Sequence, residues 1–446
     1  MEGDGDRDDA ERESEATVTG VAASGTDDDS KGAIGEPHVH QTLAAAVAAL
    51  EEAEIPWALL RGSLDGSDEE VDLLVDPPGI TRVGPLLTRA GFFPLPAIGR
   101  GGHRFFRAYD EATDRWLTLD LVADLAFGTG RSLPLAVAAE AVLARRLRDA
   151  GASRLVQDDA FWMLLLHDLL DRGSIPDHHS EQLARLVVEA RPDGQLGRAI
   201  DSVAGGGTAG QLISLVASGD RAATLAAGSR IARRWARIDR AATTRRRAGQ
   251  WILSRMRKPF TALGRPGIGV TLLGPDGVGK SSLAEALRTG FPTPTRTIYL
   301  GLYGAGLVGG GPLGLLHRLG RLWRGWLLGR WHRWRGRLVI YDRHALDARV
   351  PGRQDGARSR VRRWILAHAI PPPELVIVLD APAEVLFARK GEHDIATLDA
   401  QRRGYVDIAR TVPGAQLVDA ARDADLVRRD VMARTWQRLA QGYRGG

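Results

Sequence analysis

The sequence predicts an α/β fold in which a helix-covered parallel β-sheet forms the C-terminal part, after an α+β region and a helical connector. An apolar run at 268–273 leads directly into glycines and then into a helix-like segment. Two further apolar runs, at 337–341 and 375–379, each lead to an aspartate. Strands that alternate with helices in this way are typical of a parallel sheet with both faces covered.

Composition excludes several classes of site. The chain has 446 residues, enough for two domains, and 44% of them are hydrophobic. It contains no cysteine, which excludes disulfides, thiolate metal sites and a cysteine nucleophile. There is neither a signal-peptide pattern nor an uninterrupted apolar run of about 18 residues. We therefore expect a cytoplasmic protein without a membrane span.

Arginine carries almost all of the positive charge, because lysine occurs only at Lys31, Lys258, Lys280 and Lys390. We attribute this bias to genome-wide composition. A cluster of arginines is then weak evidence for nucleic-acid binding, and the rare lysines become informative.

The first expected domain follows an acidic tail. Residues 1–36 contain few large apolar side chains, so they cannot offset the entropy of ordering, and we expect a disordered tail. Its role is solubility or contact with basic stretches downstream. Residues 37–130 are expected to form an α+β domain, with helices at 41–54 and 80–91 and strands at 56–61, 69–75, 103–109 and 116–122.

A helical region is expected over residues 131–264. In its last part, 230–258, arginines recur among Ile, Trp and Ala at helical spacing. One interpretation is an electrostatic surface for RNA, DNA or anionic lipid. The other, which we favour, is a solvated helical connector, and nucleic acid is then not the expected partner.

The glycines before the next helix have the spacing of a phosphate-binding P-loop, Gly274-x-x-x-x-Gly279-Lys280-Ser281. Glycines let successive backbone N–H groups point at phosphate oxygens. A compact lysine ammonium fits among those oxygens better than a broad guanidinium. The Ser281 hydroxyl would ligate Mg²⁺, and the helix dipole favours an anion. The expected nucleotide-binding residues are Gly274, Asp276, Gly277, Val278, Gly279, Lys280, Ser281 and Ser282.

The expected C-terminal domain covers residues 265–446. Besides the strand before the P-loop, we expect strands at 296–300, 337–341, 375–379 and 416–418, and a helix at 312–334.

This region resembles the thymidylate kinase family of P-loop nucleoside-monophosphate kinases over about residues 268–440. The motifs that carry the resemblance are GPDGVGKSS, VIYDRH, VIVLDAPAEVLFARK and QRRGYVDIA. The resemblance implies ATP and Mg²⁺ as cofactors. It also implies transfer of the γ-phosphate to a small phosphorylated acceptor.

The resemblance assigns roles to individual residues. Asp342 corresponds to the acid that holds the Mg²⁺ water shell, and Arg343 to the arginine that grips the acceptor phosphate. Asp276 stands where the family places an aspartate close to the acceptor sugar. Arg389 and Lys390 lie where the mobile lid begins and would neutralise the transferred phosphoryl group. Alternatively, these two cations only complement a helix C-terminus.

The sequence also departs from the family. Asp347 stands near the position of a serine that helps to read thymine, and no residue clearly matches the glutamine that follows it in the family. The lid at 391–399 contains no arginine. The identity of the acceptor therefore stays open. The segment 312–334 is either a basic and aromatic wall for a large acceptor or a packed amphipathic helix with snorkelling arginines.

The N-terminal region resembles the nucleotidyltransferase superfamily over about residues 40–125. Gly62-Ser63 would contact a triphosphate, and Glu70 and Asp72 alternate on a strand so that both face the same side. The resemblance implies a second metal site, which Asp120 on a later strand would complete. Solvent-facing acids on an ordinary strand show the same alternation.

These patterns lead to the hypothesis of an ATP- and Mg²⁺-dependent nucleotide kinase with a degenerate nucleotidyltransferase-like module. The alternatives are a regulatory or scaffold protein that binds ATP without turnover, and a nucleic-acid-binding protein. The sequence leaves open whether the protein forms a homodimer.

Overall fold

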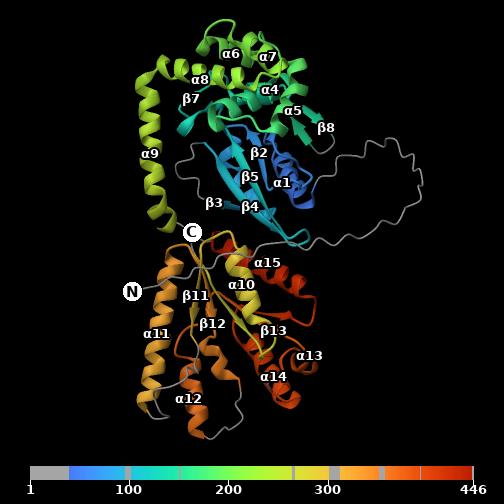
Figure 1. Ribbon diagram of the computed structural model, residues 1–446. Helices are drawn as coiled ribbons and strands as arrows, with labels where there is room; N and C mark the ends of the chain where they lie inside the picture. The colour runs from blue at the N-terminus through green and yellow to red at the C-terminus, as the bar shows by residue number, and fades with distance from the viewer. Residues whose placement is uncertain are drawn as a thin grey trace, which may run out of the picture. The chain divides into compact units, whose positions relative to one another are not determined.

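The computed structural model describes residues 40–95, 102–149, 152–263, 267–300, 312–350, 357–391 and 393–443. The expected acidic tail at 1–36 lies outside these residues. Two large β-sheets and one two-stranded sheet organise the described chain (Figure 1). Within the described residues, no helix combines the length and the apolarity that crossing a membrane requires.

The first sheet has seven strands in the order β3-β4-β5-β2-β1-β9-β8. Strand β2 runs parallel to β5, with Asp72 opposite Asp120, and antiparallel to β1. The strands are β1 (Trp57–Arg61), β2 (Glu70–Val75), β3 (Phe93–Leu95), β4 (Arg104–Asp110), β5 (Arg115–Val122), β8 (Leu147–Asp149) and β9 (Ala152–Arg154).

Successive side chains along each strand point to opposite faces of the sheet, so each face can pack against helices. Both faces of this sheet are covered in this way. Helices α1 (Gln41–Glu52) and α2 (Val83–Arg89) pack on one face, where Leu73 and Leu119 lie in their cluster. Helix α4 (Gln157–Leu166) contributes to the cluster that contains Leu74 of β2.

The region expected to be helical is mostly helical, but it also contains strands. Strand β7 (Leu133–Pro134) pairs with β6 (Ala126–Phe127), and β8 and β9 join the first sheet. These strands have only two or three residues, too few to show an alternating pattern. The helices here are α3 (Ala139–Leu143), α5 (Asp177–Leu186), α6 (Gln195–Ala204), α7 (Thr208–Ala217), α8 (Arg221–Ile238) and α9 (Arg240–Leu263).

The second sheet has five parallel strands in the order β11-β12-β10-β13-β14. This arrangement confirms the expected parallel sheet in the C-terminal part. The strands are β10 (Gly269–Leu273), β11 (Thr295–Tyr299), β12 (Leu338–Asp342), β13 (Leu375–Asp380) and β14 (Ala415–Asp419).

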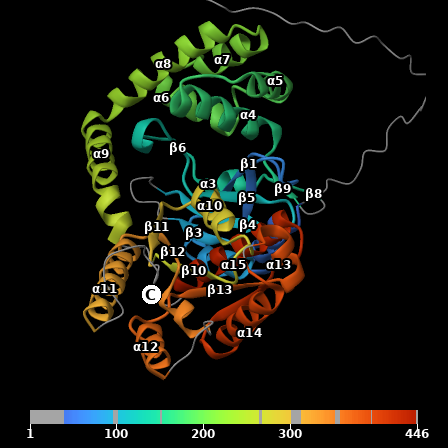
Figure 2. The same cartoon turned by 60° about the horizontal axis from the view of Figure 1, so that its bottom comes forward.

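Helices cover both faces of the second sheet (Figure 2). Helices α10 (Lys280–Gly290) and α15 (Ala424–Tyr443) pack against alternate residues of β10 and β13. The opposite face carries α11 (Pro312–Trp334) and α12 (Ala357–Ala367) over β11 and β12, and α14 (Ile395–Thr411) over β13. Helix α13 (Ala383–Lys390) follows β13. The loop after the central strand β10 therefore opens at the carboxyl edge of a rigid sheet.

Candidate active site

The loop between β10 and α10 has the backbone that its glycines predict. Gly274, Gly277 and Gly279 have φ angles of +150°, +87° and +97°. A Cβ atom at Gly274 would lie 2.7 Å from the Leu379 carbonyl oxygen, so only glycine fits there. Helix α10 begins at Lys280, slightly earlier than expected, and Ser281 and Ser282 are exposed in its first turn. The helix N-terminus therefore faces outward with its backbone donors available to an anion.

Lys280 lies folded over this loop. Its Nζ donates hydrogen bonds to the carbonyl oxygens of Gly274 at 2.8 Å and Pro275 at 2.7 Å. Burial lowers the pKa of Lys280, and the carboxylate of Asp276, whose Oδ1 lies 3.6 Å from Nζ, opposes that effect. The ammonium is thus held over the loop where a phosphate chain would lie.

Asp276 connects the loop to the neighbouring strand. Its Oδ1 accepts a hydrogen bond from Arg343 at 3.2 Å. Burial raises the pKa of Asp276, but Lys280, Arg343 and Lys390 together outweigh it and keep this pKa below its usual range. Three cationic groups from three elements therefore converge on one carboxylate.

Arg343 directly follows β12 and has a φ angle of +62°. This left-handed conformation is uncommon for a residue with a side chain, and such strain concentrates at functional sites. Asp342, the last residue of β12, is exposed at the same edge. The Ser281 hydroxyl and the Asp342 carboxylate are hard oxygen donors from adjacent parts of the sheet edge. They therefore fit Mg²⁺ chemically.

A third group at this edge is the pair formed by Asp347 and Tyr405. The Tyr405 hydroxyl donates to Asp347 Oδ1 at 3.0 Å, and the His344 backbone N–H donates to Oδ2 at 3.2 Å. Burial raises the pKa of Asp347, although Tyr405 and Arg343 oppose it. The sequence identified Asp347 only as a departure from the family, and it gave no role to Tyr405.

The structure places the two predicted lid cations, Arg389 and Lys390, in different surroundings. Lys390 is close to Gly277, because a Cβ atom at that glycine would be 3.2 Å from the Lys390 Cβ. Arg389 instead donates to the Ala420 carbonyl oxygen at 3.0 Å. His393, which sequence reasoning did not select, has Nε2 4.0 Å from Asp276 Oδ2. Of the two predicted cations, Lys390 is the one that the structure brings to the P-loop.

Comparisons with known proteins give a partial likeness to kinases. No family model matches the chain, and no curated protein matches it. A thymidylate kinase structure from Candida albicans matches with a TM-score of 0.30 and 17% identity, over 37% of this chain and 89% of that one. A deoxyadenosine kinase from M. mycoides with bound dATP matches with a TM-score of 0.28 and 10% identity, over 37% of this chain and 97% of that one. With TM-scores of 0.30 and 0.28, these likenesses do not assign a function to this chain. They give no support to the nucleotidyltransferase resemblance.

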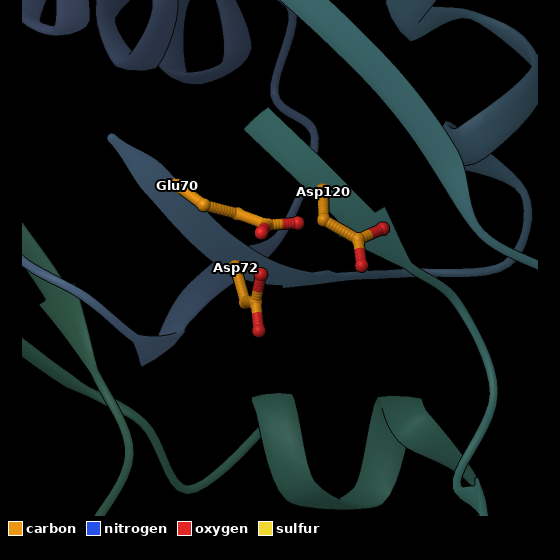
Figure 3. Close-up of side chains that lie close together, drawn as sticks. All are labelled: Glu70, Asp72 and Asp120. Atoms are coloured by element: carbon orange, nitrogen blue, oxygen red, sulfur yellow. The ribbon is translucent and has the colours of Figure 1, made fainter. Parts of the chain in front are cut away.

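The first sheet brings together the three acids that the sequence singled out. Glu70 and Asp72 project from β2 and Asp120 from β5 (Figure 3). One oxygen from each carboxylate lies within 4.8 Å of the others. Asp72 and Asp120 are buried, whereas Glu70 is exposed. The parallel register, with Asp72 opposite Asp120, produces this convergence.

Two of these acids contact an arginine or a histidine side chain. Arg61 Nε donates to Asp72 Oδ2 at 2.6 Å, and His103 Nδ1 lies 2.7 Å from Asp120 Oδ2. Burial raises the pKa of Asp72; Arg61 opposes this rise and the Asp120 charge adds to it. Carboxylate oxygens at this spacing are the donor set that a hard divalent cation prefers.

Proposed function

We propose that residues 267–443 transfer the γ-phosphate of ATP to a small phosphorylated acceptor, with a nucleoside monophosphate as the first candidate. The observation that carries the proposal is the contact between Asp276 and Arg343. It places a second cationic group beside a P-loop that already carries Lys280. A kinase for a phosphorylated acceptor needs one cationic site for the donor and another for the acceptor.

Each residue would act by position and charge. The backbone N–H groups of 276–280 and the Lys280 ammonium would hold the β- and γ-phosphates. Ser281 and Asp342 would hold Mg²⁺, which neutralises phosphate charge when bound. Arg343 would bind the acceptor phosphate, and Lys390 would stabilise charge on the transferred group. Asp276 would hold Arg343 in place or accept a hydrogen bond from the acceptor.

A test compares ADP release from ATP and Mg²⁺ by the wild type, Lys280→Ala and Arg288→Ala, with nucleoside monophosphates and sugar phosphates as acceptors. Arg288 lies on the same helix and is paired with Glu285 at the surface, so its removal is a matched control. We expect acceptor-dependent ADP release that Lys280→Ala reduces at least about a hundredfold. Arg288→Ala should retain the wild-type rate.

The same experiment separates the kinase from a protein that binds ATP without turnover. The arginine-free lid and the contact of Arg389 with Ala420 favour that alternative. ATP binding that is lost in Lys280→Ala, together with no ADP release on any acceptor, would establish it and refute the kinase.

A second candidate function is divalent-cation binding in the first sheet. The convergence of Glu70, Asp72 and Asp120 favours it. We infer that these carboxylates hold one divalent cation, independently of the P-loop.

A further inference from the structure

Helix α11 exposes an apolar stripe to solvent. Surface helices of globular proteins normally have polar residues on this side. The spacing of three or four residues places the exposed apolar residues on one face of the helix. They are Leu313 (74% exposed), Leu316 (63%), Trp323 (47%), Leu327 (54%), Trp331 (46%) and Trp334 (59%).

The opposite face of α11 attaches the helix to the second sheet. Leu322 is buried there, and Leu315, Leu319 and Trp326 pack on the same cluster. Gly325 and Gly329 allow close approach, because Cβ atoms there would lie 2.3 Å from Leu300 and 2.1 Å from Tyr341. Helix α11 is thus attached to the sheet through its inner face, and none of the residues that the structure describes buries the outer stripe.

The charge around this stripe has one sign. Residues 312–334 contain five arginines and no acid. The Arg335 guanidinium, just beyond the helix, lies 4.6 Å from the centre of the Trp331 ring. Arg324 and Arg330 are exposed as well. The outer surface of α11 is therefore both apolar and cationic.

Helix α12 extends this surface. Val361 and Trp364 are 60% and 64% exposed, next to the exposed Arg358 and Arg360. Residues 357–367 contain four arginines and no acid. Leu366 of α12 shares a buried cluster with Leu322 of α11, so both helices lie on the same face of the sheet (Figures 1 and 2).

We propose that the outer surfaces of α11 and α12 dock on an anionic lipid bilayer. Leucine side chains would enter the acyl boundary, tryptophan rings would lie at the headgroup level, and arginines would pair with lipid phosphates. Five of the 11 tryptophans in the chain lie in these two helices. Neither helix is long and apolar enough to cross the bilayer.

Charge and composition favour lipid over the other occupants. An isologous contact between two copies would set arginine-rich helices against each other, with no carboxylate on either helix. Nucleic acid would pair with the arginines and stack on the exposed tryptophans, but it would leave the exposed leucine side chains without an apolar partner. An anionic bilayer satisfies both the charge and the apolar stripe.

The test is vesicle co-sedimentation of the full chain. Vesicles of phosphatidylcholine alone are compared with vesicles of phosphatidylcholine mixed with phosphatidylglycerol. We expect binding to the mixed vesicles, salt-sensitive and at least about tenfold weaker for Leu316→Glu/Leu327→Glu. Val188→Glu, at a residue 79% exposed elsewhere in the chain, is the matched control and should bind like the wild type.

Further measurements identify the occupant. Brominated acyl chains should quench tryptophan fluorescence in the wild type and much less in the double variant. The absence of binding to mixed vesicles, or equal binding by the wild type and the double variant, would overturn the proposal. Dimerisation or RNA binding that only the double variant loses, without vesicle binding, would assign the surface to a second copy or to RNA. Lys280→Ala should keep full vesicle binding, so failure of the kinase proposal leaves this test intact.

Discussion

At the scale of single residues, the candidate active site depends on partly buried charged groups that are paired with one another. Asp276 faces Lys280 and Arg343, and Asp347 faces Tyr405 and the turn that follows Arg343. A buried carboxylate is costly unless it accepts hydrogen bonds. The Asp347 bonds to Tyr405 and to the His344 N–H therefore fix the turn that carries Arg343.

The Tyr405 hydroxyl should set the pH range of activity. Burial already raises the pKa of Asp347, and the Tyr405 hydrogen bond lowers it. Tyr405→Phe removes that lowering effect, so the pKa of Asp347 rises further and the carboxylate is protonated at a higher pH. We expect the acidic limb of the kcat/KM profile for ATP-dependent transfer to move upward by about one pH unit, because a hydrogen bond to a charged group contributes about 1.5–3 kcal/mol.

The control for this change is Thr411→Val, which removes a hydroxyl on the same helix. Thr411 donates only to the Asp407 carbonyl oxygen among the contacts that the structure gives it. Its pH profile should match that of the wild type. If Tyr405→Phe lowers kcat/KM at every pH without shifting the acidic limb of the profile, then Tyr405 acts on packing rather than on the Asp347 charge.

The sequence predicts the positions of residues that belong to one continuous motif. It does not predict contacts between residues that are far apart along the chain. The spacing of the P-loop predicts where Gly274 and Lys280 lie, because one strand and one helix fix them. The Tyr405–Asp347 bond joins residues 58 positions apart and depends on how α14 packs on the sheet. The contact of Arg389 with Ala420 likewise depends on the end of β14, which the local sequence does not specify.

At the scale of elements, apolar patterns predict the longer strands and helices well. The helix at 312–334 has the predicted bounds, and the strand that begins at Leu375 extends one residue beyond its prediction. Strands β8 and β9 were not predicted, because the residues of β8 are all exposed and β9 has only three residues, too few to show a pattern. Pairing of β9 with β1 fixes them instead.

The two faces of α11 should respond oppositely to the same substitution. Gly329→Ala places a Cβ atom 2.1 Å from the Tyr341 hydroxyl oxygen, so the helix or the buried ring must shift. We expect this variant to lower the free energy of unfolding by about 1–3 kcal/mol. Gly320→Ala meets no atom within 4 Å and should raise it by up to about 1 kcal/mol, because alanine favours helix.

Urea unfolding followed by circular dichroism measures both changes. The pair is matched, since the substitution and the helix are the same and only the face differs. Equal stability of the two variants would show that α11 is not seated on Tyr341 as described.

At the scale of the whole molecule, two oxygen-rich sites lie in two different sheets. The carboxyl edge of the second sheet carries Ser281 and Asp342, and the first sheet carries Glu70, Asp72 and Asp120. The sequence predicted that Glu70 and Asp72 share one face of a strand, and the P-loop motif pointed to Ser281, whereas family resemblances supplied Asp342 and Asp120. It could not predict that Arg61 and His103 would face two of the carboxylates, since these contacts arise from the pairing of neighbouring strands.

In the absence of nucleotide, the acids of the first sheet should bind Mn²⁺ without help from the P-loop. Without nucleotide, the P-loop site has few fixed oxygen donors, whereas the first sheet holds three converging carboxylates. We therefore expect one Mn²⁺ per chain by electron paramagnetic resonance in the nucleotide-free wild type. Asp120→Asn should weaken this binding at least about tenfold, because one anionic donor becomes neutral. Lys280→Ala should leave it unchanged.

Asp124→Asn is the matched control for Mn²⁺ binding. Asp124 is exposed just beyond β5, pairs with Arg131, and lies outside the three converging acids. It should bind Mn²⁺ like the wild type. Equal affinity in Asp120→Asn and the wild type would mean that Arg61 and His103 already occupy the oxygens of Asp72 and Asp120. The acids of the first sheet would then form structural ion pairs and would not bind a metal ion. The proposed site for metal-dependent chemistry would be the one at the carboxyl edge of the second sheet.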